Sequence, residues 1–132
     1  LVSLCAPPTA ETVRAQFVSQ TPYPEISGGE VGAVSIVLRN TGATAWRKGT
    51  PQEARLAIAG NDPKLHFLGD GWVAPDRPAA QAEDIVPPGG TATFTFAVKS
   101  AVPGTYRLSL RGVVDGGAWM DDLGLFTEIT VR

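Results

Sequence analysis

Apolar and polar residues alternate along several stretches of the chain, and a period of two is typical of β-strands. In the clearest stretch, residues 91–99, Ala92, Phe94, Phe96 and Val98 occupy every second position, and most of the intervening residues are threonine. Only an extended strand places residues i and i+2 on one face. We therefore predict a strand over residues 91–99, with one face buried and the other in contact with solvent.

Shorter runs with the same alternation predict further strands. They lie around Phe17 and over residues 34–39, 56–58, 106–111 and 127–131, with weaker candidates at 65–68 and 82–86. Turn-forming residues separate these runs, as in Asn40-Thr41-Gly42 and Pro87-Pro88-Gly89-Gly90. No segment of ten or more residues shows the 3.6-residue period of a helix.

About seven to eight short strands, each with one buried face, must pack sheet against sheet. The predicted fold class is therefore all-β, an immunoglobulin-like antiparallel β-sandwich over residues 14–132. A barrel is the alternative. The long connection 60–81 is predicted to cross between the sheets, because loops of this length are uncommon unless they are structured or functional.

The first thirteen residues differ from the rest of the chain. A short apolar run, Leu1 to Ala6, precedes Pro7-Pro8-Thr9-Ala10. We predict that residues 1–13 form a flexible segment, and three interpretations stay open: the remnant of a cleaved signal peptide, a lipoprotein tether acylated at Cys5, or a linker from a preceding domain. The bulky Leu4 departs from the small residue that usually precedes a lipoprotein cysteine.

Composition and charge exclude several functions. A length of 132 residues suits one domain, and an apolar fraction of 43% is ordinary for a globular protein. The net charge is −2 and the basic residues are scattered, which argues against nucleic acid as a partner. No apolar stretch approaches the roughly 20 residues that span a bilayer. The single cysteine excludes an internal disulfide.

Candidate catalytic and metal-binding residues are few. His66 is the only histidine and has no cysteine or serine motif beside it. Three carboxylates near the C-terminus, Asp115, Asp121 and Asp122, could bind Ca²⁺ or act as a glycosidase pair. The turn sequence Asp115-Gly116-Gly117 explains the first of them without either function. We predict a protein that is not an enzyme and has no cofactor and no metal centre, with Ca²⁺ binding at this loop left open.

The three tryptophans lie outside the alternating runs. A buried tryptophan removes about 150–250 Å² from water, so each is a strong candidate to close an end of the sandwich. We assign this role to Trp46. Trp72 and Trp119 follow glycine- and aspartate-containing loop sequences, and with Arg77 they form a candidate aromatic platform for a sugar or a peptide.

Several motifs, taken in order, resemble those of the four-tryptophan immunoglobulin-like domain. That domain is known from the central part of a eukaryotic selective-autophagy receptor, and related modules occur in secreted bacterial proteins. The similar segments are 37–42 followed by Trp46, Gly71-Trp72 with Arg77, 86–90 with 94–96, 104–106, 115–120 and 129–131. This chain has three tryptophans rather than four, with Leu108 and Leu110 where the eukaryotic form has its additional tryptophan.

The resemblance implies a non-catalytic binding or spacer module of an extracellular or cell-surface bacterial protein. It implies structural roles for Asn40, Gly42, Trp46 and Tyr106. The predicted function is recognition of protein or cell-envelope glycan through the loops that carry Trp72, Arg77 and Trp119. The alternative is a structural accessory subunit of an envelope or membrane-associated assembly that contacts its partners through strand edges.

Overall fold

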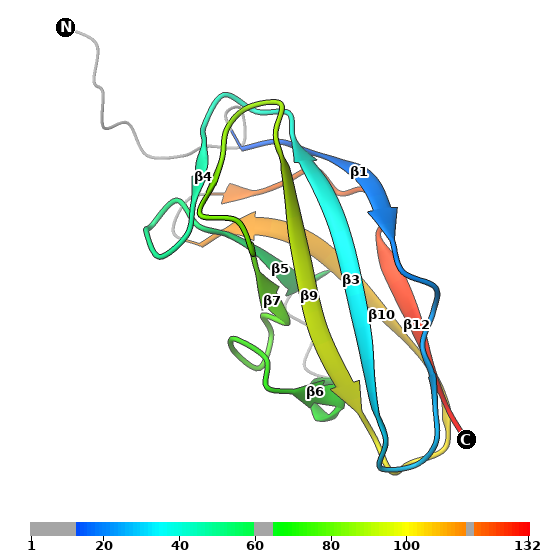
Figure 1. The fold of residues 1–132 in the computed structure, drawn as a ribbon. Coiled ribbons are helices and arrows are strands. Elements are labelled where there is room, and N and C mark those ends of the chain that lie inside the picture. Colours follow the sequence, from blue (N-terminus) through cyan, green and yellow to red (C-terminus); the bar gives the residue numbers. More distant parts are fainter. Residues whose placement is uncertain (1–12, 60–64, 116–117) are drawn as a thin grey trace, which may run out of the picture.

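The computed structural model describes residues 13–59, 65–115 and 118–132, in which the chain forms two large β-sheets packed face to face and a small two-stranded ribbon (Figure 1). The predicted all-β sandwich is confirmed. Cys5 and the rest of residues 1–12 lie outside the described residues. Val13, which the sequence analysis placed in the flexible N-terminal segment, is fully buried in the core, so the sandwich includes this residue.

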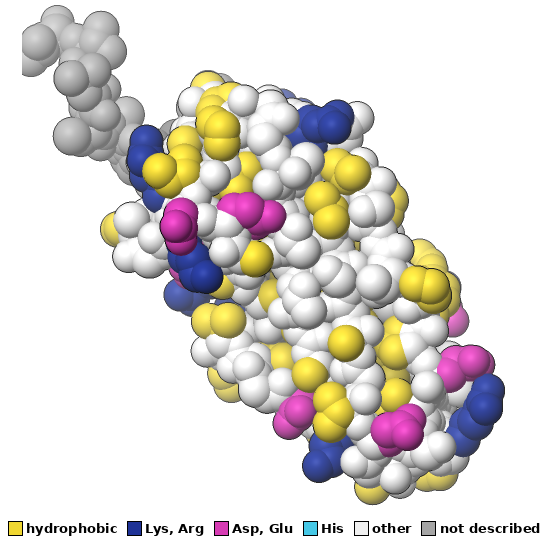
Figure 2. Space-filling view, in the orientation of Figure 1, with side chains coloured by type: hydrophobic (Ala, Val, Ile, Leu, Met, Phe, Trp, Pro, Cys, Tyr) yellow, Lys and Arg dark blue, Asp and Glu magenta, His cyan; other side chains and the backbone are white. Residues whose placement is uncertain are grey.

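The first sheet has four strands in the order β1-β3-β9-β6. They are β1 (Ala15–Gln20), β3 (Val31–Asn40), β9 (Thr91–Lys99) and β6 (Gly69–Asp70), each antiparallel to its neighbours. The strand predicted at 91–99 is confirmed. The outer face of β3 and β9 is rich in hydroxyl groups, and Ser35 Oγ lies 3.0 Å from Thr95 Oγ1 across the two strands. Figure 2 shows this face, where charged side chains gather mainly toward the margins.

The second sheet follows the order β2-β12-β10-β5-β7, and β11 pairs with the end of β10. Its strands are β2 (Glu25–Ile26), β12 (Phe126–Val131), β10 (Gly104–Val114), β5 (Ala54–Ile58), β7 (Ala79–Ala80) and β11 (Ala118–Trp119). The pairing of β2 with β12 is parallel and the others are antiparallel. A separate ribbon joins β4 (Trp46–Arg47) to β8 (Ile85–Val86).

The structure differs from the predicted strands in two places. Residues 65–68 do not form a strand. His66–Leu68 is instead a 3₁₀ helix, η2, whose tight turn buries Leu68 and leaves Phe67 exposed. The run 82–86 contributes only the two residues of β8. In the described ranges no helix is long and apolar enough to span a membrane.

The connection after β5 crosses between the sheets, as predicted. It supplies β6 to the first sheet and then returns to pair β7 with β5 of the second. The crossing connection covers part of the edge that β9 and β5 would each otherwise leave unpaired. The two-residue strand β6 pairs with β9, and the two-residue strand β7 pairs with β5.

The core is built from the alternating apolar positions of both sheets. Ile36 and Phe94 from the first sheet are fully buried, and they belong to the same apolar cluster as Leu110 and Ile129 from the second. Trp46 is also fully buried in this cluster. At about 25 cal/mol per Å², its burial alone contributes several kcal/mol as an upper figure.

Asn40 connects the end of β3 to two other segments. Its side chain is fully buried, and its Nδ2 donates to the carbonyls of Thr44 at 2.8 Å and Val86 at 3.1 Å. Its Oδ1 accepts a hydrogen bond from the Gly42 amide at 3.0 Å. Three bonds of this kind satisfy a buried amide that would otherwise destabilise the fold.

Tyr106 ties the start of β10 to the preceding turn. Its hydroxyl donates to the carbonyl of Val102, four residues upstream, at 2.8 Å. The same contact is known as the tyrosine corner of immunoglobulin-like sandwiches. The ring also packs edge-on against Phe67 of η2, with centroids 5.4 Å apart.

Replacing Asn40 by alanine should lower the free energy of unfolding by about 1–3 kcal/mol, because the Val86 and Thr44 carbonyls lose their donor. Urea denaturation followed by tryptophan fluorescence measures this change. The matched control is Arg39→Ala on the exposed face of the same strand, expected within about 0.5 kcal/mol of the wild type. Equal stabilities for the two variants would contradict the role given to Asn40.

Candidate functional site

The structure brings two of the predicted platform residues together on the outer face of the second sheet. The Arg77 guanidinium carbon lies 5.6 Å from the centre of the Trp119 ring. Arg111, which the sequence analysis did not select, lies at the same distance from that ring. Beneath them Val113 is buried although it faces away from the core, between its cross-strand neighbours Arg55 and Trp119.

Arg77 is held in place by Asp115. Its Nη2 donates to Asp115 Oδ1 at 2.8 Å, and its Nε lies 3.1 Å from Asp115 Oδ2. These hydrogen bonds hold the pKa of Asp115 below its ordinary value, and the charges of Arg77 and Arg55 act in the same direction. The same bonds raise the pKa of Arg77. The arginine is thus engaged within the fold, and its side chain is only 12% exposed.

Trp72 does not join this cluster. Its Nε1 donates to the carbonyl of Ala97 in β9 at 2.7 Å, and its ring meets Phe96 edge-on with centroids 6.0 Å apart. A Cβ atom at Gly69 would lie 2.8 Å from the ring, so only glycine fits beneath it. The half-buried ring packs against the core from the first sheet, whereas Trp119 belongs to the second. A single platform of Trp72, Arg77 and Trp119 is therefore not what the structure shows.

The three carboxylates near the C-terminus do not converge. Asp115 is bound to Arg77, and Asp121 forms two hydrogen bonds of 2.8 Å with Arg14, which lower its pKa. Asp122 Oδ1 accepts from the Gly124 amide. Lowered pKa values are the opposite of what a glycosidase acid requires. Over the described part of the chain, no three His, Cys, Asp or Glu side chains lie together as metal ligands would.

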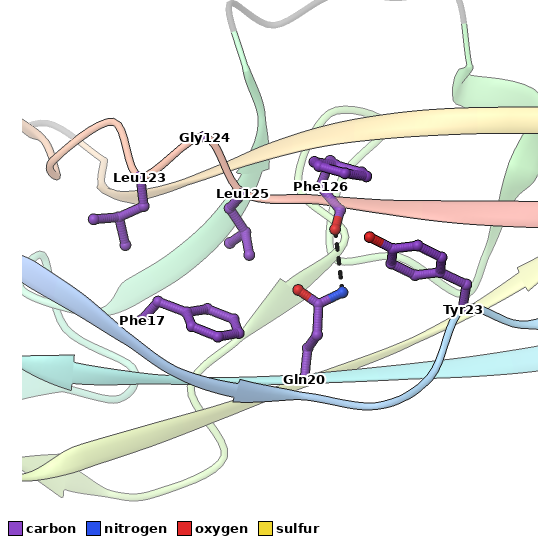
Figure 3. A pocket seen from close by; sticks show the side chains of 7 residues that line it. All are labelled: Phe17, Gln20, Tyr23, Leu123, Gly124, Leu125 and Phe126. Carbon is purple, nitrogen blue, oxygen red and sulfur yellow. Dashed lines mark hydrogen bonds between the residues drawn. The ribbon is translucent and has the colours of Figure 1, made fainter.

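A groove that the sequence analysis missed lies where the two sheets separate at one side of the sandwich (Figure 3). Its volume is ≈ 200 Å³. One wall comes from β1 and the residues after it, and the other from the segment that enters β12. The lining residues are Phe17, Gln20, Tyr23, Leu123, Gly124, Leu125 and Phe126.

The path of the chain explains the groove. At one end Arg14 and the Ala15 amide contact Asp121. At the other end the Thr130 amide donates to the Pro24 carbonyl, where β2 begins to pair with β12. Between these contacts the two segments separate, because β1 pairs with β3 of the first sheet while β12 pairs with β10 of the second.

One side chain bridges the groove. Gln20 Nε2 donates to the carbonyl of Phe126 at 3.1 Å, as Figure 3 shows. Tyr23 packs against the Phe126 ring at 5.8 Å between centroids. The edge of β12 is therefore capped at this point by a side-chain amide rather than by a neighbouring strand.

Large apolar side chains around the groove are exposed. The exposed fractions are 42% for Phe17, 46% for Tyr23 and 37% for Leu123. A β-bulge between Phe17 and Ser19 changes the alternation of β1, and four consecutive residues from Gln16 to Ser19 are exposed. One sequence feature could have pointed to this site: Leu123, a leucine in a loop between Asp122 and Gly124. The sequence alone does not show which apolar residues remain exposed in the folded protein.

A second hollow of ≈ 510 Å³ lies on the opposite side, between β7 and β9. Five alanines and a glycine form much of its wall, and Phe96 is its only aromatic lining residue. Small side chains offer less apolar contact than aromatic ones. We therefore take the aromatic groove beside β1 as the candidate site.

The similarity of this chain to one solved structure, the CARDB domain, supports the fold. No family model and no curated protein matches the chain. Among solved structures, the CARDB domain of the PF1109 protein from Pyrococcus furiosus is similar, with a TM-score of 0.54, 9% identity, and coverage of 93% of this chain and 96% of that chain. Native α2-macroglobulin from Escherichia coli gives a TM-score of 0.48 at 15% identity, over 93% of this chain and 17% of that chain. The PapD-like domain 7 of human CEP192 gives 0.44 at 12% identity, over 100% of this chain and 92% of that chain.

The pairing of Asp115 with Arg77 predicts a pH dependence. A carboxylate with a lowered pKa in the folded state stabilises the protein at neutral pH, and this contribution is lost as the pH falls through that pKa. The stability advantage of the wild type over Asp115→Asn should therefore be constant above about pH 5 and shrink as the pH falls from about 5 to about 2. Urea denaturation at each pH measures this difference. The control is Asp84→Asn, which removes an exposed carboxylate to which no arginine is ion-paired within the described ranges, and its stability relative to the wild type should change less with pH. A constant difference across this range would exclude the assignment.

Proposed function

We propose that this domain is a non-catalytic protein-binding module whose groove beside β1 receives one large apolar side chain from an extended segment of a partner protein. The observation that supports this proposal most directly is the set of exposed Phe17, Tyr23 and Leu123 side chains around one hollow. Exposed apolar residues that gather at one place, rather than singly, mark interaction sites.

The size of the groove favours a side chain over a small-molecule ligand. Binding sites for small molecules usually measure about 300–1,000 Å³. An engineered apolar cavity of about 150 Å³ holds one benzene molecule. A groove of ≈ 200 Å³ therefore suits a phenylalanine, leucine or isoleucine side chain. Single anchors of this kind often dominate the energy of a protein interface.

The strand beside the groove suits an extended partner. β1 is an edge of the first sheet, and its sequence, AQFVSQ, contains no charged residue and no proline. Proteins usually protect such edges with lysine, proline or a covering segment. A partner strand alongside β1 gains main-chain hydrogen bonds while its apolar side chain enters the groove.

This proposal develops the strand-edge alternative rather than recognition through the tryptophan loops. Trp72 is bound to Ala97 and Phe96, and Trp119 is contacted by two guanidinium groups. Their rings are already engaged, which weakens the case for a glycan platform. The resemblance to the four-tryptophan domain stays a prediction, and we extend it to propose that the module acts outside the cell or on its surface.

Filling the groove should abolish binding of an apolar probe. We expect N-acetyl-phenylalaninamide to cause saturable NMR shifts of Phe17, Tyr23, Leu123 and Phe126, whereas N-acetyl-glycinamide causes none. Leu123→Trp should remove the response because the indole occupies the hollow. The control is Val102→Ser, which replaces an apolar residue that is 59% exposed and does not line the groove. This variant should still respond to the phenylalanine probe. Shifts that persist in Leu123→Trp would contradict the proposed site.

Selection from a displayed library of random peptides tests the partner class. Peptides that bind the wild type but not Leu123→Trp should share one large apolar position. Its replacement by alanine should weaken binding at least about tenfold. Enrichment of peptides without such a position would argue against an anchor side chain.

A further inference from the structure

Three half-buried arginines lie on the outer face of the second sheet: Arg55 of β5, Arg77 before β7, and Arg111 of β10. Two of them have carboxylate partners. Arg55 Nε donates to Glu53 at 2.9 Å, and Arg77 is bound to Asp115. Arg111 has no carboxylate within ion-pair distance among the residues that the structure describes.

Arg111 is nevertheless held in one orientation. Its Nε donates to the carbonyl of Met120 at 2.7 Å, and its guanidinium lies against the Trp119 ring. Only its Nε makes a hydrogen bond in the described ranges, which leaves its two terminal nitrogens as donors. A guanidinium fixed in this way loses little side-chain entropy on binding and presents a planar pair of donors.

Asp115 lies among these arginines but does not form an ion pair with Arg111. Asp115 is shared by Arg77 at 2.8 Å and Arg55 at 3.7 Å. Partial burial strengthens the attraction between a guanidinium and an anion. Because no carboxylate of the described residues lies within ion-pair distance of Arg111, its guanidinium can bind an anion from another molecule.

We propose that Arg111 and Trp119 form a receptor for one carboxylate, supplied by an aspartate or glutamate side chain of a partner protein. The three arginines and their surrounding acids Glu53, Asp76 and Asp115 are formally neutral together, so a singly charged carboxylate fits better than a doubly charged phosphate. A protein fits better than an acidic sugar, because the two guanidinium groups already contact the ring on which a sugar would stack.

This receptor is separate from the groove beside β1 and needs a different probe. The probe is the peptide acetyl-Gly-Glu-Gly-amide, compared with acetyl-Gly-Gln-Gly-amide at matched ionic strength. NMR of the arginine Nε–H and tryptophan indole N–H groups follows binding. We expect the glutamate peptide to shift the Arg111 and Trp119 signals with an affinity at least about tenfold above that of the glutamine peptide.

Variants make the assignment specific. Arg111→Gln should abolish the difference between the two peptides, and Arg111→Lys, which keeps the charge but loses the planar donor pair, should reduce it. The matched control, Arg107→Gln, removes an exposed arginine on the same face that is paired with Glu128, and it should leave the difference unchanged. If Arg111→Gln does not fold, the proposal is tested by two other results: the reduced preference for the glutamate peptide in Arg111→Lys, and the shift of the Trp119 indole signal when that peptide is added to the wild type.

Three results would overturn the proposal. The two peptides could bind equally, the preference could persist without Arg111, or a digalacturonate probe could bind where the glutamate peptide does not, which would assign the site to acidic glycans. If the glutamate peptide binds at Arg111 but the phenylalanine probe does not bind in the groove beside β1, only the proposed function is overturned. If the phenylalanine probe binds in the groove but the glutamate peptide does not bind at Arg111, only this inference is overturned.

Discussion

Apolar contact between the inner faces of the two sheets is the interaction on which the rest of the structure depends. β3 and β9 present Ile36 and Phe94 to a core completed by Leu110 and Ile129 of the other sheet. Because side chains alternate along a strand, burying one face necessarily presents the other to solvent. The outer faces and the edges of the sheets are therefore where this protein can interact with other molecules.

The edges follow from how the chain changes sheet. β1 pairs in the first sheet and β2, five residues later, pairs in the second, so the chain crosses the side of the sandwich between them. A crossing segment cannot hydrogen-bond fully to both sheets, and Gln20 replaces one missing main-chain bond with its side-chain amide. The groove beside β1 is a direct consequence of this crossing. Its apolar lining favours an apolar side chain as the group that enters it.

Charged side chains of this protein are arranged largely by pairing. Asp115 and Asp121, which suggested a calcium site or an acid pair in the sequence, each neutralise an arginine from a distant part of the chain. Their low pKa values result from these hydrogen bonds. The same pairing leaves Arg111 as the half-buried arginine without a carboxylate in the described part of the fold, a distinction that depends on distances alone.

The sequence by itself determined the all-β class and the strand over residues 91–99, because a period of two and its turn residues are local properties. It also predicted the burial of Trp46, from the large apolar area that a tryptophan removes from water. It did not determine the partners of Asp115, the separate positions of Trp72 and Trp119, or the exposure of Phe17 and Leu123. Those depend on contacts between residues far apart in the chain: Arg77 and Asp115 are 38 positions apart, and Gln20 and Phe126 are 106 apart. Only the packing of the two sheets decides which of the apolar and charged residues meet, and therefore where a partner can bind.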